Sequence, residues 1–194
     1  VEGISVYGAP KDMLGKTPEG LRQLKDAGLD MVYMGLESGD DGVLQEVKKG
    51  VTAEEMIAAG IKVREAGMVL SMTVISGLGG KKRWREHALN SAKVISAIKP
   101  EYVGFLTLMV EPGTELYDQY NRGEVELLDP QEVLDETELF IRNVDAEGTV
   151  FRANHASNYI ALGGTLNAER DKILEQIAES RRRSKFRPDI FRGI

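Results

Sequence analysis

The residues best suited to ligand chemistry follow two expected strands, at the point where each strand ends. The first strand covers residues 30–36, and the carboxylate of Glu37 and the hydroxyl of Ser38 come directly after it. The second strand covers residues 68–75 and continues into a glycine-rich stretch, residues 76–80. Parallel α/β folds bind their ligands at the carboxyl ends of strands. We therefore expect the ligand site at these two strand ends.

Glu37 and Lys49 are the charged candidates. A carboxylate at position 37 can accept hydrogen bonds from ribose hydroxyls or from an amino group, and a solvated acid that caps the next turn is an equally ordinary explanation. Ser38 could share either role. Lys49 follows just before the next expected helix and could pair with a ligand carboxylate. A solvated lysine is the commoner outcome, and Lys48 beside it competes for the role.

The glycine-rich stretch after the second strand could let the backbone approach a ligand closely. Residues 76–80 read Ser-Gly-Leu-Gly-Gly, which matches neither the dinucleotide fingerprint nor a P-loop. A phosphate or an adenine could lie there, and a flexible turn explains the stretch equally well. Thr73 faces the same side of the strand as Ile75, and a packed threonine is the likelier role for it alone.

The histidines and the absence of cysteine limit the metal chemistry. The chain has no cysteine, which excludes disulfides and Cys-ligated metals within these residues. A zinc site would need both histidines and carboxylates, which we do not expect. His155 lies in the polar segment 154–159 and could be a general acid/base, but we favour a role in holding the loop. We expect His87 on a helix surface.

The expected elements alternate between strands and helices. Helix starts are indicated by Thr17 with Pro18, by Thr52 with Glu55, and by Asp129 with Pro130. Further expected elements are a strand over 4–7, a helix over 84–98, a strand over 102–110 buried on both faces, helices over 115–121 and 168–182, and a strand or extended passage over 149–151. This order predicts an α/β fold with a parallel sheet, either part of a barrel or a small open sheet.

The composition fits an ordinary globular protein. The 194 residues are 42% hydrophobic and carry a net charge of −6, which argues against a protein that coats nucleic acid. No apolar run approaches a membrane span, and no signal peptide is visible at the start, so we expect a cytoplasmic protein. The chain starts directly in a strand-like segment, and we expect it to be a piece of a longer protein.

Taken together, several segments resemble a known family. They are residues 35–39 (Gly-Leu-Glu-Ser-Gly), Lys49-Gly50, residues 75–79 (Ile-Ser-Gly-Leu-Gly) and residues 111–117. In this order they resemble the carboxyl-terminal part of the core of a radical S-adenosylmethionine (SAM) enzyme. Residues 154–158 and 162–166 also resemble a subgroup of the Fe–S oxidoreductases described as oxygen-independent coproporphyrinogen III oxidase-like.

The resemblance implies a (β/α)6 TIM-like partial barrel that binds SAM and a [4Fe–4S] cluster. Residues 1–123 would be the carboxyl-terminal half of this barrel, and residues 124–194 a helical extension with a basic tail. In the family a Cys-x3-Cys-x2-Cys segment binds the cluster, which cleaves SAM to a 5′-deoxyadenosyl radical. That segment is absent here, so we expect no cluster in this chain and no activity of the isolated chain, whatever the parent enzyme does.

The resemblance also assigns roles to residues, one by one. Glu37 falls where the family has a Gln or Glu that contacts SAM, and Lys49 where a basic residue meets the SAM carboxylate. Thr73 stands where an Asp often holds a ribose hydroxyl, which departs from the family pattern. The remaining matched positions are Tyr7, which would face SAM, Ile75, Ser76 and Gly77 along the adenine, and Leu108 and Met109 at its border.

Two other functions fit the residues alone. One is a small α/β enzyme that binds a phosphorylated metabolite at the 77–80 loop. The other is a non-catalytic interaction domain that recruits a partner through the basic tail at 181–185. If the chain is part of a radical SAM enzyme, its expected partners are SAM and an unidentified substrate, and we expect no membrane partner. An exposed sheet edge would favour dimerisation.

Overall fold

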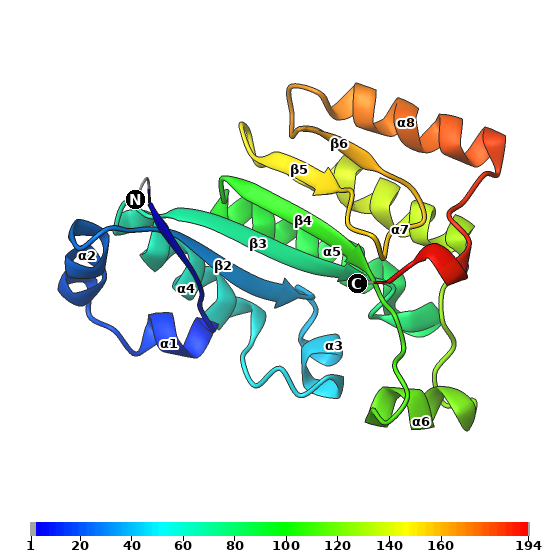
Figure 1. Cartoon of the computed structure of the whole chain (residues 1–194), viewed down its shortest axis with the longest axis horizontal. Helices are drawn as coiled ribbons and strands as arrows, with labels where there is room; N and C mark the ends of the chain where they lie inside the picture. Colours follow the sequence, from blue (N-terminus) through cyan, green and yellow to red (C-terminus); the bar gives the residue numbers. More distant parts are fainter. Residues whose placement is uncertain (1–2, 194) are drawn as a thin grey trace.

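The computed structural model describes residues 3–193 and places six strands in one sheet (Figure 1). The strands follow one another across the sheet in chain order: β1 (Ile4–Tyr7), β2 (Leu29–Glu37), β3 (Val69–Ser76), β4 (Tyr102–Thr107), β5 (Val150–Ala153) and β6 (Leu162–Thr165). All neighbours are parallel except β5 and β6, which pair antiparallel. The predicted α/β class and parallel βα units are therefore confirmed.

Helices connect the parallel strands. They are α1 (Pro10–Leu14), α2 (Pro18–Asp26), α3 (Asp41–Glu46), α4 (Ala53–Glu65), α5 (Gly80–Ile98), α6 (Glu115–Asn121), α7 (Pro130–Asn143) and α8 (Arg170–Arg183), with a 3-10 turn at Asp189–Phe191. The expected caps form: the side chains of Thr52 and Asp129 accept from backbone N–H groups at the start of α4 and α7, and the third residue of each helix completes a capping box.

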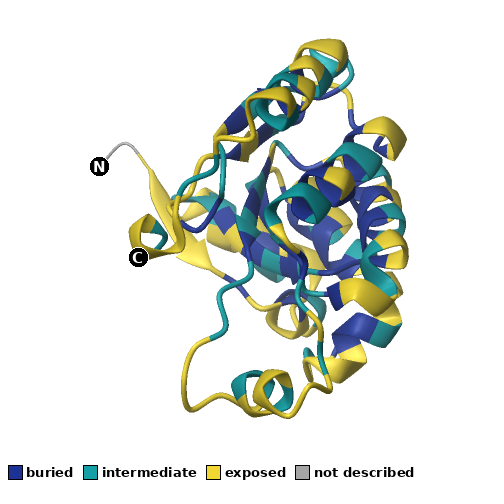
Figure 2. Ribbon diagram, turned by 90° about the vertical axis from the view of Figure 1, so that its right-hand side faces the viewer, coloured by how far each residue is buried: buried dark blue, intermediate teal, exposed yellow. Residues whose placement is uncertain are grey.

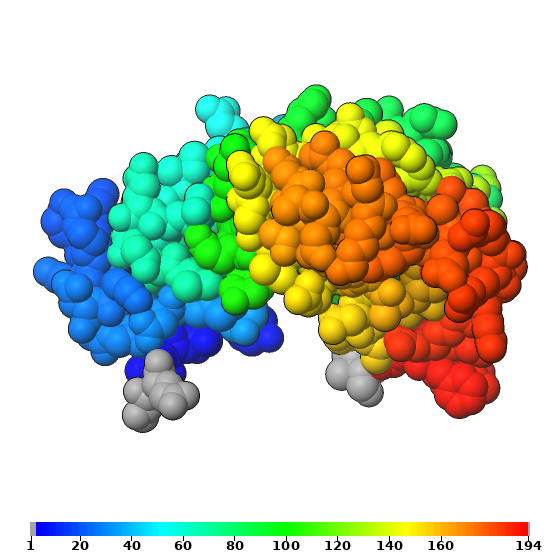
Figure 3. Space-filling model, turned by 90° about the horizontal axis from the view of Figure 1, so that it is seen from above, coloured from blue at the N-terminus to red at the C-terminus, as the bar shows by residue number. Residues whose placement is uncertain are grey.

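One face of the sheet is buried beneath helices and the other is open. Alternate residues of the central strands are fully buried, whereas their neighbours are partly exposed. The buried set comprises Val32, Met34, Leu36, Leu70, Met72, Val74, Val103 and Phe105. Figure 2 shows the buried strand residues beside the layer of helices. Seen from above, the molecule is hollowed between its N-terminal and C-terminal segments (Figure 3).

Some elements differ from the sequence prediction. Strand β4 ends at Thr107 and is fully buried on one face only, because its other face lines the open side of the sheet. Helix α8 starts at Arg170, two residues later than expected, because Asn167 before it has a left-handed φ of 65° and its side chain accepts from the backbone N–H of Ala146. Helices α1 and α3 and strand β6 were not predicted. No helix within residues 3–193 has the length and apolar character that crossing a membrane requires.

Candidate functional site

The end of β2 presents the carboxylate of Glu37 on the open side of the sheet. Glu37 has a left-handed φ of 60°, and the pairing with β3 shifts register there. Its Oε1 accepts a hydrogen bond from Lys49 Nζ at 2.9 Å. A Cβ on Gly35 would lie 2.0 Å from that oxygen, so the carboxylate folds back over a position that only glycine leaves open.

The structure distinguishes the two neighbouring lysines. Lys48 Nζ points away to Glu115 at 2.5 Å, and its side chain is 71% exposed. The side chains of Lys49 and Glu37 are only 21% and 26% exposed. The ion pair at the strand end therefore belongs to Lys49, the residue that the resemblance selects.

The end of β3 forms a tight turn in which the amides of Gly77, Leu78, Gly80 and Lys81 already donate hydrogen bonds. Gly77 has φ 84°, and its N–H donates to Glu136 Oε1 at 2.9 Å. The N–H groups of Leu78, Gly80 and Lys81 donate to backbone carbonyls. A phosphate needs free amides and no nearby acid. The turn therefore does not support the phosphate-binding alternative.

A pocket of about 300 Å³ opens at the ends of β3 and β4. Ser76 and Gly77 form one side of it, and Leu108 and Met109 line it from the segment after β4. Its other walls come from three segments, namely Tyr117 and Tyr120 of α6, residues 127, 128 and 133, and Tyr159 with Asp189 and Arg192. Four of the ten residues chosen from the sequence thus line one tyrosine-rich pocket that has both apolar and charged walls.

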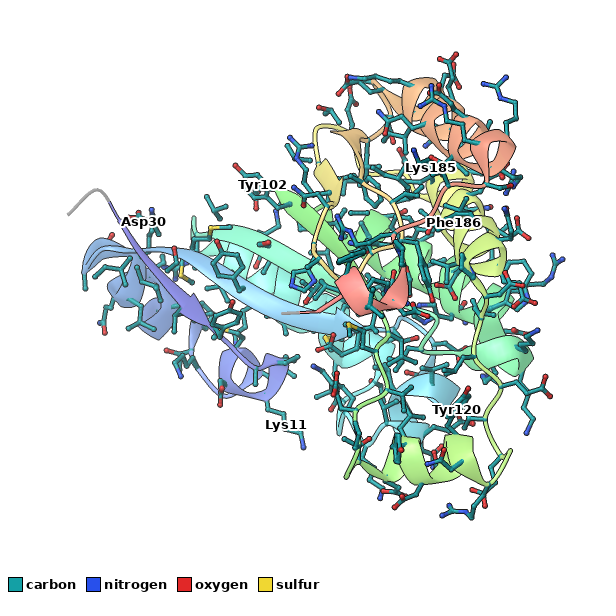
Figure 4. The ribbon with its side chains drawn as sticks, turned by 45° about the vertical axis from the view of Figure 1, so that its right-hand side comes forward. Lys11, Asp30, Tyr102, Tyr120, Lys185 and Phe186 are labelled. Carbon is teal, nitrogen blue, oxygen red and sulfur yellow. The ribbon has the colours of Figure 1, made fainter. Side chains whose placement is uncertain are left out.

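The C-terminal segment closes one wall of this pocket. Arg192 donates to the carbonyls of Ser157 and Leu108 and lies 3.8 Å from the ring of Tyr159. Arg187 donates to three carbonyls of the loop at residues 155–158. Figures 1 and 4 show this segment, which follows Phe186, passing across the ends of the strands. Arg187 is thus held against this loop, whereas residues 182–185 of the basic tail are exposed.

The other selected residues lie in different environments. Tyr7 is 88% exposed on the edge strand β1, with its ring 5.3 Å from that of Tyr33. Thr73 and Ile75 lie on the open face of β3 and are half-buried. Ser38 is fully buried on the helix side of the sheet, so the structure does not place it beside the Glu37 carboxylate. His155 contacts the Ser157 hydroxyl at 2.9 Å and holds its own loop.

Two buried titratable residues were missed or misjudged from the sequence. His87 was expected on a helix surface, but its side chain is 1% exposed, because it belongs to the inner stripe of α5 with Ala88 and Ser91. Glu136 is 1% exposed on the inner face of α7. The signal was present: both residues fall at helical spacing within an apolar stripe, as Val133 and Phe140 show for Glu136.

Parallel βα units with helices on one face of the sheet are the arrangement found in partial (β/α) barrels. Within this class, residues 2–92 match the family model described as "Radical SAM superfamily". Residues 2–92 are therefore part of a radical SAM domain, which confirms the superfamily predicted from the sequence.

Curated relatives and solved structures extend the similarity beyond residue 92. "Heme chaperone HemW" of Bacillus subtilis is 25% identical over 147 residues, which is 75% of this chain and 37% of the relative. "Uncharacterized protein MJ0486" of Methanocaldococcus jannaschii is 27% identical over 135 residues, 69% of this chain and 41% of the relative. The chain thus spans about two fifths of these relatives.

Two solved structures share the fold. The archaeal Methanocaldococcus infernus Elp3 superposes with a TM-score of 0.64 at 18% identity, covering 95% of this chain and 42% of that one. Coproporphyrinogen III oxidase (HemN) from Escherichia coli superposes with a TM-score of 0.56 at 20% identity, covering 72% and 31%. Both support the partial-barrel fold, including the sheet beyond β3.

Proposed function

We propose that this chain is the SAM-binding part of a radical SAM iron–sulfur enzyme, whose parent cleaves SAM reductively. The Glu37–Lys49 ion pair at the end of β2 is the observation that carries the proposal. The methionine part of SAM has both an ammonium and a carboxylate. Glu37 and Lys49 offer one opposite charge to each, so ligand binding would exchange one internal ion pair for two external ones.

The adenosine part is proposed to lie at the ends of β3 and β4. The pocket there offers apolar contact from Leu108 and Met109 and close backbone approach at Ser76 and Gly77. Strands β2, β3 and β4 are direct neighbours, so this pocket and the Glu37–Lys49 pair share one edge of the sheet. On the open face of β3, Thr73 would lie beside the ribose and Ile75 along the adenine.

The residues of this chain do not fit an iron–sulfur cluster. The sequence contains no cysteine. Within residues 3–193, no three His, Asp or Glu side chains converge as a metal site would require. Clusters of this kind need thiolate ligands, so the proposal places the cluster on residues outside these 194. We assign this chain the binding and orientation of SAM only, and we expect it to be inactive by itself.

The first prediction concerns SAM binding by the isolated chain. Titration with SAM up to several millimolar, followed by ¹H–¹⁵N NMR, should shift the amides of Lys49, Gly77 and Met109 and give a Kd of about 1 mM or weaker. Lys49→Gln should weaken binding about tenfold, because an ion pair with the SAM carboxylate of roughly 1.4 kcal/mol is lost. Lys48→Gln removes the same charge one residue away and is the matched control.

Three results would contradict the proposal. Amide shifts confined to other surfaces would show that SAM does not bind at the strand ends. Equal weakening of SAM binding by Lys49→Gln and Lys48→Gln would show a general effect of charge and no specific contact with Lys49. Micromolar binding measured by calorimetry would show that tight binding does not need the cluster, against the expectation for this chain.

For the parent we propose the coproporphyrinogen III oxidase-like subtype, as the segments 154–158 and 162–166 suggest. The similarity to the Bacillus subtilis heme chaperone and the fold shared with the Escherichia coli oxidase support it. Curated "tRNA uridine(34) acetyltransferase" relatives are 27–28% identical over 110 residues. Titration with coproporphyrin III and with a tRNA would compare the two substrate classes, and preferential binding of the tRNA would contradict the subtype.

A further inference from the structure

A buried polar cluster lies directly beneath the two strand ends and has no role in the binding proposed so far. It consists of Ser38 after β2, His87 on α5, Glu136 on α7, and Ser76 with Gly77 at the end of β3. Ser38, Ser76, His87 and Glu136 are each at most 1% exposed. Burying this many polar groups is costly unless they are paired, so their arrangement calls for a reason.

The contacts run from one strand end to the other. His87 Nδ1 lies 2.8 Å from Ser38 Oγ, which in turn accepts from the backbone N–H of Asp40. On its other side, His87 Nε2 lies 3.8 Å from Glu136 Oε1, too far for a hydrogen bond but close enough for the imidazole to sense a charge on Glu136 when that carboxyl ionises. The same Glu136 oxygen accepts from Gly77 N–H at 2.9 Å.

We propose that Glu136 and His87 are positioning residues that hold the ends of β2 and β3 in a fixed relation, and thereby set the spacing of the two parts of the ligand site. Through Ser38, His87 supports the residue next to Glu37. Through Gly77, Glu136 supports the turn beside the pocket. The positioning role itself does not depend on the proposed function. Only the statement that this spacing serves SAM binding rests on it.

An acid at position 136 is not what simple packing would select. The neighbouring inner positions of α7, such as Val133 and Phe140, are apolar, and Glu136 Oε2 has no hydrogen-bond partner among the described residues. A residue kept only for packing would be a leucine or methionine, which avoids this cost. The acid is explained by the hydrogen bond that its Oε1 accepts from Gly77 N–H, and the nearby Ser76 hydroxyl also favours its charged form.

Burial keeps both titratable groups neutral near pH 7. It raises the pKa of Glu136 to about 8, and it lowers the pKa of His87 to about 4. Above pH 8 the Glu136 charge would strengthen its bond from Gly77 N–H and act on the imidazole 3.8 Å away. Ionisation of Glu136 should therefore change the surroundings of the residues at the ends of both β2 and β3.

The charges around Glu136 are otherwise paired with one another. Lys81 of α5 pairs with Glu132, one turn before Glu136, and Asp40 at the start of α3 pairs with Arg83 and also acts on His87. Arg181 of α8 pairs on the outer side of α7 with Asp135 and Glu138. The end of β3 presents only the Ser76 hydroxyl and the Gly77 amide. His87 is thus the titratable group that faces Glu136 directly.

The test follows the ligand-free chain from pH 6 to 9 by NMR. The chain has two histidines, so the ring ¹H–¹³C signals of His87 and His155 are easily told apart. In the wild type, the His87 ring, the Gly77 amide and the Ser38 amide should all shift with one common midpoint near pH 8. In Glu136→Gln this midpoint should vanish from all three, while Glu175→Gln, an exposed control on α8, should leave it unchanged.

SAM titration of the variants then connects the cluster with binding. Glu136→Gln keeps an acceptor for Gly77 N–H and should bind within about twofold of the wild type. Glu136→Leu loses that acceptor and should bind at least tenfold more weakly, with amide shifts at both Gly77 and Ser38. A Glu136→Leu chain that does not fold would leave the pH titration and Glu136→Gln as the deciding measurements.

The inference is overturned if the titration near pH 8 persists in Glu136→Gln, or if it reaches Gly77 but not Ser38 in the wild type. These measurements need no ligand. A chain that shows the common titration but does not bind SAM at the strand ends would therefore overturn the proposed function and leave the positioning role of the cluster intact.

Discussion

At the level of single residues, the candidate site has some polar side chains on the open face of the sheet and others buried beneath it. Glu37 and Ser38 are adjacent in the sequence, yet the carboxylate lies on the open side of the sheet and the hydroxyl lies beneath it. Alternation along a strand explains this division, because neighbouring side chains point to opposite faces. The sequence could suggest both residues, but only their faces distinguish a binding role from a supporting one.

Glu136 provides a prediction about stability and pH. Between pH 6.5 and 8 the folded chain keeps the Glu136 proton that the unfolded chain has lost. Folded His87 is neutral throughout this range, whereas unfolded His87 is half protonated at pH 6.5 and neutral by pH 8, which offsets a smaller part of the change. The folded state thus binds more protons, so its stability falls as the pH rises through this range, by roughly 1 to 2 kcal/mol. Below pH 6.5 proton uptake by unfolded His87 opposes this trend.

Urea unfolding at pH 6.5 and at pH 8 measures this change. Glu136→Gln should lose the fall in the free energy of unfolding, because its side chain does not titrate. Glu175→Gln removes an exposed carboxylate on α8 and should retain it. An equal fall in the free energy of unfolding of the wild type and both variants would show that groups other than Glu136 cause it.

At the level of elements, close contact between the end of β2 and helix α5 carries the site. Gly39 N–H donates to Ser91 Oγ at 2.8 Å, and a Cβ on Gly39 would lie 2.4 Å from the carbonyl oxygen of Asn90. Backbone atoms cannot yield as a side chain can. The glycine therefore lets α5 approach closely enough for His87 to reach Ser38.

Gly39→Ala should consequently force α5 away from the strand end. We expect a loss of about 2 to 3 kcal/mol in the free energy of unfolding, typical of overpacking, and a change in the His87 ring signals. Gly104→Ala on β4 is the matched control, because its Cβ would meet the Thr73 methyl group at an ordinary 3.7 Å. Unfolding by urea compares the two variants, and equal losses would refute the explanation.

The accuracy of the element prediction followed the strength of the local signals. The capping boxes at Thr52 and Asp129 marked α4 and α7 correctly, because these contacts form within a few residues. Strand β6 was missed, since two of its four residues are glycine and its stability comes from pairing with β5. The burial of Glu136 could have been inferred from its place in the apolar stripe of α7, but its hydrogen bond with Gly77 could not, because the two residues are 59 positions apart in the sequence.

At the level of the whole molecule, the sheet has an unprotected edge within the described residues. All four residues of β1 are exposed, including Ile4 at 52% and Val6 at 39%. An apolar edge strand is a template for pairing with another chain. This observation underlies the expected dimerisation, which stays a prediction.

Sedimentation velocity at increasing concentration should show self-association of the chain. Val6→Lys should reduce it, because a charge on an edge strand opposes pairing between chains. Lys185→Ala, on the far side of the molecule in the C-terminal segment, is the control (Figure 4). A monomer at all concentrations, or equal association of both variants, would contradict a role of the β1 edge.

The residues that form the two walls of the pocket are synthesised at different times. Ser76 and Gly77 line one side, and Asp189 and Arg192 line the other. A ribosome that adds 5 to 20 residues per second produces the second wall roughly 6 to 20 s after the first. During that interval the apolar residues after β4 have no cover from the C-terminal segment. Once β4 has been synthesised, the nascent chain thus passes through a period in which β1 to β4 can pair while the pocket is still open, and its apolar residues are then most exposed to aggregation.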